Sequence, residues 1–230
     1  MKATVAQLVQ LPGVWRGGEL EQAAHPVHPT GHARLDAELP GGGWPTGTLS
    51  EVLHDGVGIG EIRLLAGALA RAAQGARLIG WVNPPHLPYA PGLAQAGIPL
   101  ESCLVVRPAN REDALWSAEQ ALKSGACGAL LLWMERFPEE YAWLRRLQMA
   151  AESGRAMAVL LRSTAAEKHS TPSHLRVVLS RDGGALKVRI PKRRGPALVQ
   201  PVSLACSGLP SSFPPSRSRS PNALALLPSR

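Results

Sequence analysis

Short apolar runs alternate with amphipathic segments through the middle of this chain, and this alternation limits the folds that it can adopt. The runs that read as buried strands lie at 48–54, 77–82, 102–106, 127–134 and 156–162. Strands that are apolar on both faces are typical of parallel sheets covered by helices on both sides. The pattern therefore predicts an α/β fold with a mostly parallel sheet flanked by helices.

Three of the intervening segments have helical features. Segment 61–74 places apolar residues at i, i+3, i+4 and i+7, and Gly75 follows it as a helix stop. Asn110 is a suitable N-cap for a helix that runs to residue 123, and Pro138 suits the first turn of a helix that runs to about residue 152. These segments provide the covering layers that the buried strands require.

A hairpin and a basic tail follow the alternating region. The apolar stretches 175–180 and 185–190 flank an Asp-Gly-Gly turn, which favours a C-terminal β-hairpin at the edge of the sheet. Beyond Pro191 the chain is rich in Pro, Ser and Arg, a composition typical of disorder. We therefore expect three regions, a leader at 1–30, a core domain at 31–191 and a disordered basic extension at 192–230.

Charge separates this extension from the core. The chain has 230 residues with 25 Lys and Arg against 17 Asp and Glu, a formal net charge of +8, and eight of the cations but none of the anions lie beyond Asp182. Such asymmetry favours an acidic partner for the C-terminal part. The nucleic-acid-binding candidates are Lys187, Arg189, Lys192, Arg193 and Arg194.

This basic stretch has two interpretations. In a strand, Lys187 and Arg189 share one face, so the cluster would extend along an exposed edge and suit weak, salt-sensitive contact with a DNA backbone. The alternative is a charged edge that prevents aggregation between strands. No aromatic residue lies between 185 and 196, so we do not expect base stacking.

Composition excludes several other classes of protein. No apolar run approaches the ~20 residues that cross a bilayer, and the N-terminus lacks the features of a signal peptide. Three scattered cysteines provide neither a disulfide framework nor a metal cluster, and we interpret His25, His28 and His32 as part of a polar loop. We expect a cytoplasmic protein that holds no metal and no cofactor.

A glycine-rich loop between strand 48–54 and helix 61–74 has the layout of a phosphate-binding P-loop. Such a loop cradles phosphates with backbone amides, while a Lys reaches the terminal phosphates and a Ser or Thr holds magnesium. Here Glu61 and Ile62 follow the last glycine, and the first repels phosphate while the second cannot bind a metal. The residues of this degenerate phosphate loop are Gly56, Gly58, Gly60, Glu61 and Ile62.

Tryptophans provide the candidate anchors for a protein partner. Four of the six fall on predicted helices or strands and are expected in the core, namely Trp81, Trp116, Trp133 and Trp143. Trp15 and Trp44 lie in loop-rich segments instead. Because tryptophan is enriched at interface hot spots, these two are the predicted partner-binding residues.

The segment before the first strand resembles the entry to the RecA ATPase core. Thr30, Gly31, Leu35 and Asp36 match a Thr-Gly-x-x-x-Leu-Asp stretch that precedes a glycine-rich turn and the first core strand there. The resemblance implies a RecA-like core. It also implies that the lysine and threonine of the RecA P-loop fall on Glu61 and Ile62, as argued above.

The resemblance further implies that the other catalytic groups of RecA are missing. The catalytic glutamate of RecA falls on or near Pro85, and the aspartate that ends its Walker B strand falls near Trp133. Glu135 lies two residues further on and would point differently. A scaffold without these groups has no means of phosphoryl transfer, so we expect no enzyme activity.

Five motifs together resemble the ImuA family over residues roughly 5–205: VWRG at 14–17, LPGGGWP at 39–45, GIGE at 58–61, PPHLPYAP at 84–91 and LWSAEQALKSGACGALLLW at 115–133. ImuA is a RecA-like protein of bacterial mutagenesis cassettes. The resemblance implies a non-catalytic adaptor of DNA-damage-induced translesion synthesis in the SOS response. Its implied partners are a DnaE-type polymerase and ImuB, a protein similar to Y-family polymerases. RecA and DNA are further implied partners.

Two alternatives remain open. SulA proteins also resemble trimmed RecA folds without ATPase activity, and they inhibit cell division by binding FtsZ. The N-terminal leader and the basic extension of this chain favour ImuA, because SulA proteins are shorter. The other alternative is a divergent ATP-binding DNA-repair protein that uses substitute residues.

Overall fold

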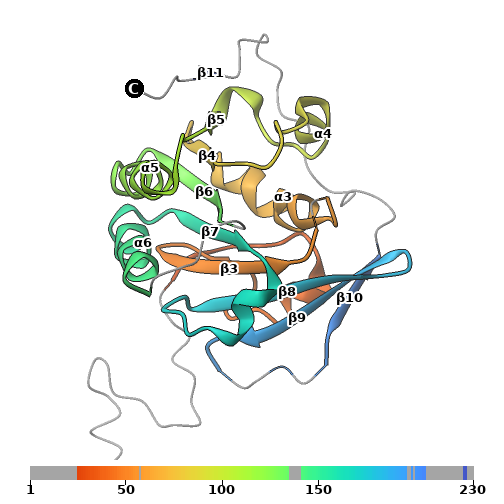
Figure 1. Cartoon of the computed structure of the whole chain (residues 1–230). Coiled ribbons are helices and arrows are strands. Elements are labelled where there is room, and N and C mark those ends of the chain that lie inside the picture. The colour runs from red at the N-terminus through yellow and green to blue at the C-terminus, as the bar shows by residue number, and fades with distance from the viewer. Residues whose placement is uncertain are drawn as a thin grey trace, which may run out of the picture.

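A nine-stranded sheet forms the centre of the molecule and confirms the predicted α/β class (Figure 1). The computed structural model describes residues 25–56, 58–134, 141–195, 198 and 200–205, and the backbone of 225–226. The strand order is β10-β9-β8-β3-β7-β6-β4-β5-β11. The strands are β3 (Thr48–His54), β4 (Leu78–Val82), β5 (Cys103–Val106), β6 (Cys127–Trp133), β7 (Met157–Arg162), β8 (Leu175–Asp182), β9 (Ala185–Lys192), β10 (Val202–Ala205) and β11 (Ala225–Leu226).

The interior of this sheet is parallel and one edge is antiparallel. Strands β5, β4, β6, β7, β3 and β8 pair in parallel, as a RecA-like core requires. The predicted hairpin is present as β8 and β9, which pair antiparallel. Strand β10 adds to β9 with Val202 opposite Val188, although the sequence pattern did not predict a strand there. The sheet therefore continues past Pro191, into the region expected to be a separate extension.

Helices cover both faces of the sheet. The long helices are α3 (Glu61–Ala72), α5 (Arg111–Lys123) and α6 (Tyr141–Gly154), and the short elements are β1 (Val27–His28), α2 (Ala33–Asp36), β2 (Trp44–Pro45), α4 (Ala90–Gln95), η1 (Leu100–Ser102) and η2 (Thr164–Lys168). Figure 1 shows α5 and α6 side by side on one face, with α3 on the other. None of the helices that the structure describes could span a membrane.

Each face of the sheet has its own core. Leu65 and Leu69 of α3 belong to the cluster that contains Leu131 of β6. Leu130, the adjacent residue, belongs to the opposite cluster with Leu147 of α6. Because successive side chains of a strand point to opposite faces, burial on both sides explains why β6 is a continuous apolar run.

A buried ion cluster lies on the face of β3 and β8 that η2 covers. The Glu51 carboxylate accepts hydrogen bonds from the Nε of Arg176 at 2.8 Å and from the hydroxyl of Thr171. Arg162 Nη1 lies 3.3 Å from the same carboxylate. Arg176 also donates to the carbonyls of Glu167 and His169, both at 3.0 Å, so the cluster ties the segment after β7 to the sheet.

We predict that Glu51→Ala lowers the free energy of unfolding by about 3–5 kcal/mol, because it leaves two buried guanidinium groups without their carboxylate. Urea denaturation measures this loss. The matched control is Glu101→Ala, an exposed glutamate on η1, which we expect to change stability by no more than about 0.5 kcal/mol. A loss below about 1 kcal/mol for Glu51→Ala would mean that the arginines reach solvent or other partners.

Candidate functional site

The loop between β3 and α3 lies at the carboxyl end of a central parallel strand, where open α/β sheets bind ligands. Its backbone requires glycine at two positions in particular, since Gly58 has φ +77° and Gly60 has φ +116°. Gly60 is also the N-cap of α3 and offers no side chain to the helix. The free amides at this helix start must therefore be satisfied by another group.

Glu61 supplies an acceptor for the N-cap amide and for one amide of the loop before it. Its Oε1 accepts a hydrogen bond from the Gly58 amide at 3.1 Å, and its Oε2 accepts one from the Gly60 amide at 3.0 Å. The side chain folds back over the loop and the residue is 4% exposed. A carboxylate at a helix N-terminus is also favoured by the helix dipole. Glu61 thus places its own carboxylate on two amides of the glycine-rich loop.

Ile62, the other residue singled out in this loop, contributes to packing. Its side chain is half-buried and packs against the core beneath α3. It offers no oxygen to a metal ion or a phosphate. The two residues that follow Gly60 are thus both engaged within the protein.

Asp55 anchors the start of the loop to η2. Its Oδ1 accepts hydrogen bonds from the Ser163 hydroxyl at 3.2 Å and the Thr164 amide at 3.1 Å, and its other oxygen accepts from the Thr164 hydroxyl. The Thr164 hydroxyl contributes most to holding the pKa of Asp55 below its ordinary value of 3.8. The ionised Asp55 carboxylate therefore stabilises the folded state fully at pH values above 3.8. This contribution is lost as the pH falls through the lower pKa of Asp55 in the folded state.

Asn83 joins the ends of three strands, a role that the sequence pattern did not reveal. Its amide donates to the carbonyl of Val106 at 2.9 Å, and its Nδ2 donates to the carbonyl of Trp133 at 3.0 Å. Its φ of +54° lies in the left-handed region, which asparagine tolerates better than most residues. At the two positions where the resemblance to RecA places catalytic carboxylates, this chain has the exposed Pro85 and the buried Trp133. Glu135 lies outside the described residues.

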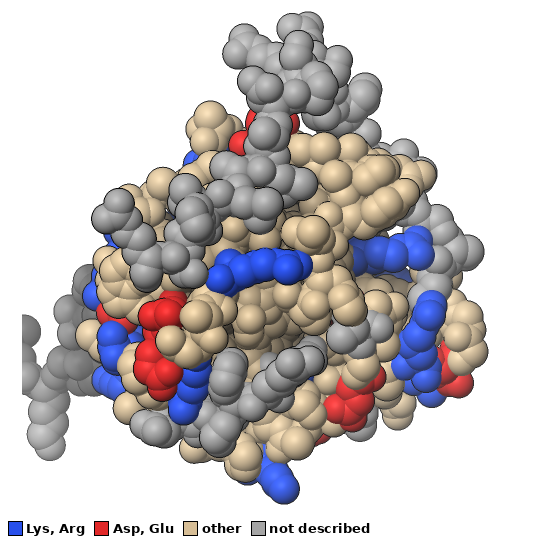
Figure 2. Space-filling model, turned by 45° about the horizontal axis from the view of Figure 1, so that its top comes forward, with Lys and Arg blue, Asp and Glu red and all other residues tan. Residues whose placement is uncertain are grey.

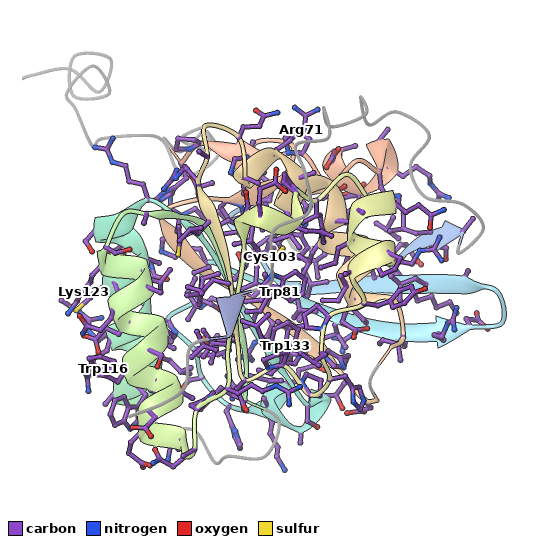
Figure 3. The ribbon with its side chains drawn as sticks, turned by 90° about the horizontal axis from the view of Figure 1, so that it is seen from above. Arg71, Trp81, Cys103, Trp116, Lys123 and Trp133 are labelled. Carbon is purple, nitrogen blue, oxygen red and sulfur yellow. The ribbon has the colours of Figure 1, made fainter. Side chains whose placement is uncertain are left out.

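Two tryptophans stack inside the core near this edge of the sheet. The rings of Trp81 and Trp133 lie 5.9 Å apart with an interplanar angle of 16°. Figure 3 shows both near the centre of the molecule, with Cys103 close to Trp81 and Trp116 on the outer side of α5. Burial raises the pKa of the Cys103 thiol to about 11, so this cysteine is not a nucleophile at neutral pH.

The structure reverses the expected positions of two other tryptophans. The expectation that Trp44 anchors a partner is wrong, because its side chain is 0% exposed in the core beneath α3. The expectation that Trp116 belongs to the core is also wrong, because it is 62% exposed. The inward face of α5 carries Leu115, Ala118 and Leu122, and Trp116 lies off that face. Trp15, the second predicted anchor, lies outside the described residues.

The basic stretch is largely engaged by acidic and carbonyl groups of the protein. Lys187 lies 2.6 Å from Asp182, and Arg189 forms two hydrogen bonds of 2.5 Å with Glu167. Lys192 donates to the Thr171 carbonyl at 2.7 Å. Arg193 pairs with Glu38, and Arg194 is exposed.

These contacts change the electrostatics of the edge. The pKa of Glu167 is lowered, first by its hydrogen bond with Arg189, and the pKa of Asp182 is lowered by its hydrogen bond with Lys187. Lys187 and Arg189 share the outer face of β9 as predicted. Figure 2 shows Lys and Arg side chains spread over the visible face, several beside Asp or Glu, instead of gathered in one patch. Binding of DNA by this stretch stays a prediction.

Comparisons with known proteins agree with this architecture. Residues 47–158 match the family described as cell division inhibitor SulA. SulA of Edwardsiella piscicida is 31% identical over 98 residues, which cover 43% of this chain and 57% of that protein. RecA of Leifsonia xyli is 28% identical over 137 residues, which cover 57% of this chain and 38% of that protein. RecA of Thermus aquaticus is 29% identical over 119 residues, which cover 52% of this chain and 35% of that protein.

The chain is therefore similar to SulA and RecA proteins over part of its length. It spans little more than half the length of this SulA relative and little more than a third of these RecA proteins. The SulA match extends from the start of β3 to the start of β7 and so includes the glycine-rich loop.

We predict that Glu61→Ala lowers the free energy of unfolding by about 1–2 kcal/mol, because the amides of Gly58 and Gly60 lose their acceptor. Urea denaturation measures the change. Glu112→Ala is the matched control, since Glu112 also occupies the first turn of a helix but is exposed. Equal stability changes in the two variants would show that the Glu61 contacts add nothing beyond the helix dipole.

Proposed function

We propose that this chain is a non-catalytic RecA-like adaptor of DNA-damage-induced translesion synthesis and mutagenesis, supporting an error-prone complex of ImuB and a DnaE-type polymerase. The observation that carries the non-catalytic part is the Glu61 carboxylate on the amides of Gly58 and Gly60. RecA itself and DNA are further partners in this proposal.

Phosphoryl transfer needs a cation on the phosphates, a metal ligand and a group that positions the nucleophile. The candidate positions for these groups among the described residues hold Glu61, Ile62, Pro85 and Trp133. None of these side chains supplies a cation, and Glu61 is occupied by loop amides. A nucleotide would have to displace that carboxylate and would then meet its charge, so the site favours neither ATP binding nor hydrolysis.

Exposed apolar side chains support the adaptor part of the proposal. Leu87 is 57% exposed and Tyr89 is 74% exposed, and both lie in the segment 84–91, which proline stiffens. Trp116 is a third exposed apolar side chain, on α5. Large aromatic residues on a rigid segment lose little conformational entropy on binding, which is typical of interface anchors. The likeness to SulA and RecA proteins supports a role in the response to DNA damage.

A second candidate function is a SulA-like cell-division inhibitor that binds FtsZ. The match of residues 47–158 to the SulA family is the specific observation that favours it. The two functions share a non-enzymatic core and differ in the partner. Filamentation of cells that overproduce this chain, abolished by an FtsZ variant that escapes inhibition, would favour the second function.

We predict that isothermal titration calorimetry detects no saturable binding of magnesium ATP, because Glu61 already occupies the loop amides. A RecA protein titrated under the same conditions serves as the positive control. Saturable, magnesium-dependent binding that is lost in Gly60→Val would contradict the proposal. That result would favour a divergent ATP-binding DNA-repair protein.

We predict that the chain co-purifies with folded ImuB, and that the double variant Leu87→Ala, Tyr89→Ala weakens this complex at least about tenfold. Surface plasmon resonance with immobilised ImuB measures the affinity. The matched control is Tyr141→Ala with Met149→Ala, two exposed apolar residues of α6 on the other face of the sheet. Absence of any complex with wild-type protein would contradict the adaptor function, and an equal loss in both double variants would place the contact elsewhere.

A further inference from the structure

A cavity of about 220 Å³ lies between the glycine-rich loop, α3 and the β9–β10 edge of the sheet. Its apolar part is formed by Leu64, Leu186 and Leu204, which are all buried. Its polar part is formed by His32, Arg63 and Arg181. Strand β10 completes this cavity, so it depends on the strand that the sequence pattern did not predict.

The cavity is chemically distinct from the amide cradle of the loop. Gly58 and Gly60 border it, but their amides are bonded to Glu61. A ligand in the cavity therefore binds through side chains. The available groups are two guanidinium groups, an imidazole and a leucine surface.

Arg63 and Arg181 differ from three other cations near this edge of the sheet. Lys187, Arg189 and Arg193 each have a carboxylate within 4 Å. No carboxylate of the described residues forms a salt bridge with Arg63 or Arg181, and both are exposed. Burial lowers the pKa of His32, and the nearby Arg63 adds to this effect against the opposing Asp36 carboxylate. The cavity thus combines an apolar surface with two guanidinium groups that form no salt bridge with a described residue.

We propose that this cavity binds a short acidic segment of a protein partner, in which an apolar side chain lies beside Asp or Glu. The apolar side chain packs on Leu64, Leu186 and Leu204, and the carboxylate pairs with Arg63 and Arg181. This inference rests on the proposed adaptor function, because it specifies the chemistry of a partner. It assigns a second contact surface in addition to the segment 84–91.

Size and lining both favour a peptide over a nucleic acid. The volume is below the ~300–1,000 Å³ typical of small-molecule sites, so the cavity accommodates one or two side chains better than a whole nucleotide. None of its described lining residues has a Phe, Tyr or Trp ring on which a base could stack. Contact with a phosphate backbone alone makes no use of three buried leucines.

The test is fluorescence anisotropy with a short fluorescein-labelled peptide in which leucine alternates with aspartate. We expect saturable binding of this acidic peptide. Its affinity should be at least about tenfold higher than that of the same peptide with lysine in place of aspartate. It should exceed the affinity of the peptide with serine in place of leucine by a similar factor. The variants Arg63→Ala and Arg181→Ala should each weaken binding of the acidic peptide about tenfold, the usual effect of losing a charged hydrogen bond.

Two further variants make the test specific to this cavity. Ala205→Glu places a carboxylate at the exposed rim and should abolish binding, whereas Arg145→Ala removes an exposed arginine of α6 and should leave it unchanged. Thermal unfolding followed by circular dichroism verifies that each variant is folded. A folded Arg63→Ala, Arg181→Ala double variant with wild-type affinity overturns the proposal.

The remaining outcomes also decide the matter. Equal binding of the lysine peptide overturns the proposal, because the contact would then not depend on charge. Tighter binding of a labelled oligothymidine, lost in the two arginine variants, overturns it in favour of nucleic acid. If the peptide does not bind but the chain still binds ImuB, only the proposal for this cavity is rejected. If the peptide binds but ImuB does not, the proposed polymerase partner is rejected.

Discussion

Burial of both faces of the central sheet is the constraint on which the rest of the structure depends. A polar group buried on either face is costly unless it finds a partner within the protein. Glu51 meets this requirement with two arginines, and Gln148 of α6 meets it at the other end of β3. The Gln148 side-chain carbonyl accepts from the Leu49 amide at 2.9 Å and from the Thr48 hydroxyl at 3.1 Å. Thr48 and Glu51 of β3 therefore join the sheet to its covering layers.

Glu61 is a buried polar residue too, and its carboxylate also finds partners within the protein. The sequence shows a carboxylate next to a glycine-rich loop, and this charge alone predicts repulsion of phosphate. The structure adds that the carboxylate is the acceptor for that loop, at 3.1 and 3.0 Å from two amide nitrogens. This arrangement depends on left-handed backbone at Gly58 and Gly60, which one-dimensional spacing does not specify. A single residue thus bonds two amides of the loop with its own carboxylate.

Elements with strong periodicity were predictable, and those that depend on distant partners were not. Helix α3 starts at Glu61 and α5 follows the predicted Asn110 cap, whose side chain accepts from the Asp113 amide. Strand β10 has only two buried apolar residues and follows a proline-rich stretch, so only its pairing with β9 defines it. Trp116 is a different case, because its position off the Leu115 face was visible in the helical spacing. Its place on a predicted helix suggested burial, and the helical spacing was the better guide.

Most of the described cations of the C-terminal part have partners within the protein. The excess of +8 lies beyond Asp182, yet Lys187, Arg189 and Arg193 are compensated by Asp182, Glu167 and Glu38. A paired cation on a surface contributes little attraction for a further anion. Arg63 and Arg181 belong to the neutral part of the chain but have no such partner among the described residues. Local pairing, and not the net charge of a segment, therefore separates Lys187, Arg189 and Arg193 from Arg63 and Arg181, and it is the reason to look for an acidic ligand beside the glycine-rich loop.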